Sequence, residues 1–260
     1  MPRCSVALLL PPLWLALLPA STVAGELPRG DCAAPKARSD LSHCDFSGRK
    51  LIGLDLRGAR LAGAKLENAD LRRTDLSGAD LRGVNGKWAK FVGGKLAGAN
   101  FGNADLFHAI FDEADLAGAH FAGAYLFGAN LIEAKAGRAD FSGAYLKDVL
   151  MEGIDLSGGS LRNCYIFRGV FSGARLVGTD LSGADLTGAA LDEVDFSGAK
   201  LRGTRLAGAT LRQAVFFKAD LERANFSNAD VWGTRFEQAR NLDPTVAEAA
   251  IEPFVVRGRR

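Results

Sequence analysis

The three histidines of this 260-residue chain, His43, His108 and His120, are the side chains best suited to acid–base or metal chemistry. Histidine titrates close to neutral pH and is the commonest metal ligand in proteins. A metal site, however, needs several ligands aimed at one point. His43 precedes the repetitive part of the chain, and His108 and His120 occupy different phases of a five-residue repeat, so they need not converge. We therefore predict no metal site and no cofactor.

Aspartates are far more numerous, and carboxylates can act as general acids and bases. Asp70, Asp75 and Asp80 recur every five residues, a regularity that spreads carboxylates over the surface instead of collecting them in one site. A charged surface of this kind discourages aggregation. Ser77 and Ser142 belong to the same repeat and have no base at a matching position. We predict that the chain has no catalytic residues and is not an enzyme.

The cysteines suggest covalent chemistry of a structural kind. Cys32 and Cys44 flank the entry to the repetitive region, and in an oxidising compartment this pair is a candidate disulfide that staples the N-terminal end. Two free thiols are the alternative. Cys164 stands at a position where the repeat otherwise places a small inward residue, so we expect a buried free thiol there.

Residues 1–25 have the pattern of an export signal. Arg3 supplies a positive charge, an apolar run extends from Val6 to Leu18, and small residues before Glu26 offer a cleavage site. The apolar run is shorter than the ~20 residues needed to cross a bilayer. We expect the signal to be cleaved, with a retained anchor as the alternative, and the mature protein to be periplasmic or extracellular without a membrane span.

A period of five organises the rest of the chain. From Phe46 to Phe236 every fifth residue is in one phase, and Leu or Phe fills most of these 39 central positions without an insertion or deletion. A small residue stands two positions earlier, a mostly polar residue stands immediately before, and glycine commonly stands two positions later. Only Gly86 and Ala136 lack a large central side chain, and Trp88 is a candidate to cover the gap at Gly86.

Neither a helix nor an uninterrupted strand has a period of five. The order of small, polar and large residues instead predicts a three-residue strand followed by a two-residue corner, with glycine meeting any need for positive φ. Each unit has only two inward side chains, so stacked neighbours must complete the core. All eight prolines lie at or before residue 35 or at or after residue 244, as a continuous hydrogen-bonded ladder requires.

Units such as ADLRG at 79–83 and ADLTG at 184–188 resemble the repeats of the pentapeptide-repeat family, whose pattern is A(D/N)LXX. The resemblance implies an all-β fold, a right-handed quadrilateral parallel β-helix with 20 residues per coil. The three tyrosines, Tyr125, Tyr145 and Tyr165, are spaced by 20 and favour four-sided coils. The repeats then make about ten coils, a rod roughly 45–50 Å long at ~4.8 Å per coil.

The repeat boundaries divide the chain into four parts: signal peptide 1–25, N-terminal cap 26–45, β-helix 46–240, and C-terminal cap helix with basic tail 241–260. Open solenoid ends expose unpaired backbone groups and need caps. Asp243 is a candidate N-cap and Pro244 suits the first helical position, so we predict a short helix over 244–252. Arg257, Arg259 and Arg260 make the tail basic, and we expect it to be solvated.

Charge limits the functions that the resemblance suggests. Some cytosolic members of this family protect topoisomerases by imitating DNA, a mechanism that needs a strongly negative rod. The chain has 32 basic and 30 acidic residues, so a DNA mimic is the least favoured reading, and we expect no nucleic-acid partner.

One side of the predicted rod departs from the repeat by carrying aromatic residues outward. Exposed aromatic clusters often mark a contact surface, so we predict a non-catalytic scaffold that binds a protein, or a second copy of itself, here. A tyrosine row that binds an envelope polysaccharide is the alternative, and stacking that only stiffens the rod is a third interpretation. Lys147 interrupts the second row. The predicted patch consists of Phe107, Tyr125, Phe127, Tyr145, Tyr165 and Phe167.

Overall fold

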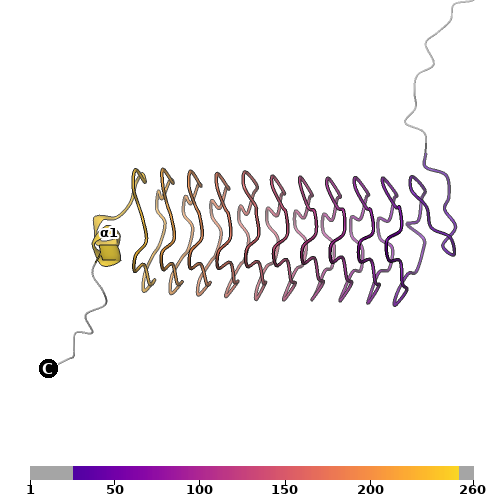
Figure 1. Cartoon of the computed structure of the whole chain (residues 1–260), viewed down its shortest axis with the longest axis horizontal. Helices are drawn as coiled ribbons and strands as arrows, with labels where there is room; N and C mark the ends of the chain where they lie inside the picture. Colours follow the sequence, from indigo (N-terminus) through magenta and orange to yellow (C-terminus); the bar gives the residue numbers. More distant parts are fainter. Residues whose placement is uncertain (1–25, 252–260) are drawn as a thin grey trace, which may run out of the picture.

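Each five-residue unit forms one side of a four-sided coil, and the coils stack into a rod (Figure 1). The computed structural model describes residues 26–251, so the predicted signal and the basic tail lie outside the described residues. Parallel bridges join residues 20 apart, from Asp45 with Lys65 to Asp220 with Arg240. This register confirms the coil length that the tyrosine spacing predicted.

The ladder between coils uses one outward residue per unit. The Lys65 amide donates to the Cys44 carbonyl oxygen (3.2 Å), and the Lys65 carbonyl oxygen accepts from the Phe46 amide (2.8 Å). Each strand is thus a single bridged residue long, shorter than the three residues that the sequence predicted. The reason is that a turn follows each central residue at once: the Arg49 amide donates to the Phe46 carbonyl oxygen (3.0 Å).

Every such turn needs positive φ at its third residue, as in type II turns. Gly48 has φ 68° there, but residues as large as Trp88 (φ 54°) and His108 (φ 51°) adopt the same conformation. The turn is also capped by the preceding outward aspartate: Asp45 Oδ1 accepts from the Ser47 amide (3.0 Å). The repeated aspartates therefore hold the corners in place in addition to keeping the surface charged.

The core consists of the central and small residues of all four sides, most of them fully buried. Phe121 stacks on Phe101 and Phe141 with centroid distances of 4.8 Å and 4.6 Å. The expectation that Trp88 covers the gap at Gly86 is wrong. Trp88 is 42% exposed at the surface, and a Cβ on Gly86 would lie 2.9 Å from a Leu106 methyl group, so Leu106 of the next coil already fills this space.

Both ends of the rod are covered. At the N-terminus Arg29 bridges Asp40, which bridges Arg60, so the ladder begins before the first predicted repeat. At the C-terminus the helix α1, Pro244–Ile251, follows the last coil, close to the predicted 244–252. The Asp243 carboxylate caps the helix by accepting from the Thr245 amide (2.9 Å). Among residues 26–251 no helix is long and apolar enough to cross a membrane.

Candidate interaction surface

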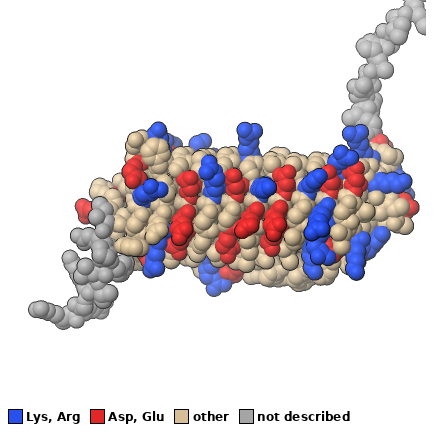
Figure 2. Space-filling model, viewed as in Figure 1, with Lys and Arg blue, Asp and Glu red and all other residues tan. Residues whose placement is uncertain are grey.

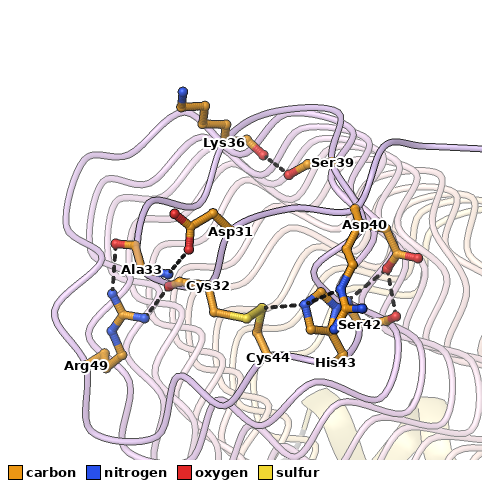
Figure 3. Close-up of a disulfide and its surroundings, with 11 residues drawn as sticks. Asp31, Cys32, Ala33, Lys36, Ser39, Asp40, Ser42, His43, Cys44 and Arg49 are labelled. Carbon is orange, nitrogen blue, oxygen red and sulfur yellow. Dashed lines mark hydrogen bonds between the residues drawn. A yellow bond between two sulfur atoms is a disulfide. The ribbon is translucent and has the colours of Figure 1, made fainter.

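The only group of potential metal ligands that the structure brings together in residues 26–251 lies in the N-terminal cap (Figure 3). The donor atoms of Cys32, His43 and Cys44 lie within 4.8 Å of one another. The two cysteines are joined in a disulfide, however, so their sulfurs are not thiolates. His43 Nε2 lies 3.8 Å from Cys44 Sγ and accepts from Arg29 Nε at 3.4 Å. In this state one imidazole remains as a ligand, too few to hold a metal.

Cys164 is a free, buried thiol, as the sequence predicted. Its Sγ donates to the Phe141 carbonyl oxygen at 2.9 Å. Burial raises the pKa of this thiol to about 12. Because the thiolate is the reactive form of cysteine, Cys164 is a packing residue without nucleophilic character at neutral pH.

The tyrosine row forms a stacked ladder on one side of the rod. The ring centroids of Tyr125 and Tyr145 lie 5.1 Å apart at an interplanar angle of 17°, and those of Tyr145 and Tyr165 lie 5.1 Å apart at 28°. The rings thus cover one another's faces and turn their edges outward. Tyr125 and Tyr165 at the ends of the row are 40% and 37% exposed.

The phenylalanine row occupies the adjoining corner. Phe107 and Phe127 stack at 5.5 Å. Lys147, which the sequence suggested as an interruption, connects the row instead: its ammonium lies 5.7 Å from the Phe127 ring centroid and 5.9 Å from that of Phe167. Cation–π contacts of this length are attractive.

The two rows touch, since Tyr165 and Phe167 stack at 6.2 Å, so the structure places all six predicted residues on one surface. Trp88 adds to it by an edge contact with Phe107 at 5.3 Å. We call the surface formed by the tyrosine and phenylalanine rows the aromatic side. The aromatic side spans Phe107, Tyr125, Phe127, Tyr145, Tyr165 and Phe167.

The next side of the coil carries a second apolar row that sequence reasoning missed. Successive bridges align its outward residues from coil to coil, and their half-buried side chains are apolar except for Asn130. The sequence signal was available: reading the outward positions every 20 residues instead of every five isolates this row. We call it the aliphatic side, and it consists of Ile110, Leu150, Val170 and Ala190.

Carboxylates line the far corner of the aliphatic side, and we call this group the acidic edge. Its members are Asp112, Glu113, Glu133 and Glu152. None of them takes part in the fourteen ion pairs of the described residues, from Arg57–Asp55 to Arg240–Asp220.

Two members of the acidic edge are poorly solvated. Burial, with the nearby charge of Glu113 as a smaller cause, raises the pKa of Asp112 above its usual value, although its carboxylate accepts from the Ile132 amide. Glu152 Oε2 is buried without a hydrogen-bond partner in the described part of the chain. A cation at this edge would therefore meet carboxylates that lack a counterion.

The total charge of the chain is close to zero, but basic and acidic side chains are distributed unevenly along the rod. Residues 26–100 contain fourteen basic and nine acidic side chains, whereas residues 101–160 contain three basic and nine acidic ones. On the face seen in Figure 2, basic side chains gather toward the N-terminal end. The aromatic side and the acidic edge both lie mainly in the acidic middle coils.

Comparison with known families identifies the repeat. The family model "Pentapeptide repeats" matches in eight copies, over residues 39–78, 87–123, 124–163, 170–206 and 204–240. The chain belongs to the pentapeptide-repeat family. The right-handed quadrilateral β-helix that the sequence predicted, with a short C-terminal helix, is thereby confirmed.

The solved structures that are similar to this pentapeptide-repeat protein include two that cover about three quarters of it. One is HetL, a pentapeptide-repeat protein involved in heterocyst differentiation regulation from the cyanobacterium Nostoc sp.; it has 30% identity and a TM-score of 0.46, over 75% of this chain and 89% of that chain. The other is QnrB1, a plasmid-mediated fluoroquinolone resistance protein, with 24% identity and a TM-score of 0.48, over 77% of this chain and 94% of that chain. No curated protein matches the chain significantly.

Proposed function

We propose that this protein is a non-catalytic, exported scaffold that binds another protein through its aromatic side, in the periplasm or cell envelope. The observation that carries the proposal is the pair of stacked aromatic rows at the surface of successive coils, where the repeat elsewhere places mostly polar residues. Tyr125 and Tyr165 are exposed, and the other four rings are half-buried. Rigid aromatic side chains supply large contact area at low entropic cost, and they are enriched among residues that dominate binding energy. The rod supports them on a ladder that is hydrogen-bonded from coil to coil.

Export is supported by the N-terminal pattern of the sequence and by the disulfide. Disulfides persist in oxidising compartments and are rare in the cytosol. The bond between Cys32 and Cys44 ties the cap to the first coil, and Arg49 reinforces this connection by donating to the Cys32 carbonyl oxygen (Figure 3). A cap stabilised in this way suits a protein that works outside the cytoplasm.

The geometry favours a protein partner over the two alternatives. Stacking a sugar requires an exposed ring face, but Tyr145 is covered on both faces by Tyr125 and Tyr165, so at most the outer faces of the two end tyrosines are open to stacking. DNA mimicry requires negative charge along the whole rod, whereas residues 26–100 carry an excess of basic side chains. A protein surface can pack against ring edges and lysine stems alike.

Affinity capture from an envelope extract, followed by direct binding of each captured protein to the purified rod, tests the proposal. We expect the interaction to weaken at least tenfold in a serine variant of the tyrosine row. A matched serine variant on the opposite side of the coil should bind like the unmodified protein. Unchanged binding by a folded tyrosine variant would refute the proposal. The tyrosine variant is Tyr125→Ser, Tyr145→Ser, Tyr165→Ser, and the control is Lys95→Ser, Lys135→Ser, Arg175→Ser.

A further inference from the structure

The aromatic side and the aliphatic side are adjacent and form a largely apolar surface around one corner of the rod, which also carries Lys147 and the ion pair between Arg168 and Asp148. The tyrosine row lies on one side, the phenylalanine row fills the corner, and Ile110, Leu150 and Val170 occupy the next side at the same coils. Ile132 extends the apolar surface to the following corner. A contiguous patch of this kind marks an interaction surface more strongly than scattered apolar residues do.

The acidic edge borders this surface on one flank, and its four carboxylates form no ion pair within residues 26–251. Several outward aspartates elsewhere on the rod pair with arginines, as in Arg212 with Asp230 at 2.6 Å and Arg202 with Asp220 at 2.7 Å. At Glu152 one carboxylate oxygen is buried and has no hydrogen-bond partner among residues 26–251. The edge therefore offers carboxylates that could accept charge-assisted hydrogen bonds from the lysines or arginines of a bound segment.

We propose that the partner presents a cationic amphipathic polypeptide segment, an inference that rests on the proposed function. Its apolar side chains cover the aromatic and aliphatic sides, while its lysines or arginines pair with the acidic edge. Charge complementarity selects this class: residues 101–170, which carry the proposed surface, contain nine acidic and five basic side chains. This negative excess repels nucleic acids and anionic lipid surfaces, and it attracts cationic segments.

A pair of designed peptides tests the inference. Both have 18 residues with leucine on one helical face, and the opposite face carries lysine in one peptide and glutamate in the other. Fluorescence anisotropy measures their binding to the purified protein. We expect the lysine peptide to bind and the glutamate peptide not to bind. Neutralising the acidic edge should weaken binding of the lysine peptide about tenfold, by the substitutions Asp112→Asn, Glu113→Gln, Glu133→Gln and Glu152→Gln.

A variant with the same change in net charge on the opposite side of the rod is the control, and we expect its affinity to change less than twofold. Equal losses in both variants would show unspecific charge attraction and overturn the inference, as would equal binding of the two peptides. The control carries Asp40→Asn, Asp80→Asn, Asp140→Asn and Asp180→Asn.

The captured envelope partner separates failure of this inference from failure of the proposed function. If the tyrosine variant loses the partner and the edge-neutralised variant keeps it, the scaffold function stands and the cationic segment is refuted. If neither variant loses it, the proposed function itself is wrong. Loss in both variants supports both proposals.

Discussion

The internal phenylalanine ladder should contribute measurably to stability beyond its burial. Phe121 stacks on Phe101 and Phe141 and makes an edge contact with Phe111 at 5.6 Å. Each aromatic pair contributes ~0.5–1.5 kcal/mol beyond area burial. Phe171 is equally buried but belongs to none of the ring pairs among residues 26–251. Phe121→Leu should therefore lower the free energy of unfolding more than Phe171→Leu does, by about 1.5–4.5 kcal/mol for three lost pairs.

Guanidinium unfolding, followed by both circular dichroism and tryptophan fluorescence, measures this difference. The two signals must coincide, because repeat arrays can lose two-state behaviour and then no single free energy applies. Both substitutions replace a buried phenylalanine by the commonest central residue of the repeat, so their burial and cavity terms largely cancel in the comparison. A difference below about 0.5 kcal/mol would refute the idea that ring stacking, separate from burial, stabilises the rod.

Three further predictions concern the cap, a corner and the response to acid. Replacing both cysteines of the cap disulfide with serine should destabilise the N-terminal coils by about 3 kcal/mol from loop-closure entropy, measured by hydrogen exchange; unchanged protection of residues 40–60 would contradict this. Gly128→Ala should cost more stability than Gly143→Ala, because both have positive φ but only at Gly128 would a Cβ collide with the His108 imidazole; equal melting temperatures would show that His108 moves freely. Hydrogen bonds from neighbouring arginines lower the folded-state pKa of Asp70 and Asp80 below the usual 3.8, so their stabilisation is complete above pH 3.8 and is lost as the pH falls from there through the lower folded-state pKa; a melting temperature that stays constant from pH 5 to pH 2 would refute the assignment.

Local features of this rod were predictable because they depend only on neighbours in the chain. The five-residue period places Leu126 inward and Tyr125 outward whatever the rest of the fold does, since alternation along a short strand is a local property. The absence of prolines between residues 35 and 244 likewise indicated an unbroken ladder. The N-cap at Asp243 and the helix α1 followed from local capping preferences in the same way.

Contacts between coils needed the tertiary structure, because residues 18 to 20 apart meet only when four sides close into a coil of fixed register. In the sequence Lys147 interrupts the phenylalanine row, but in the rod its ammonium lies near the rings of both Phe127 and Phe167. The aliphatic side could be read from every twentieth outward position, but only the bridged coils bring Ile110, Leu150 and Val170 into one row.

The sequence by itself determined a solenoid with a polar surface and an apolar core, because every unit repeats the same local pattern. It also determined that one side carries aromatic residues, because these depart from that pattern. Only the tertiary structure decided that the apolar surface continues around a corner and ends at an acidic edge, where one oxygen of Glu152 has no hydrogen-bond partner among residues 26–251. The physical reason is that pairing between charges depends on distance in space, and a total charge near zero says nothing about which carboxylates meet an arginine.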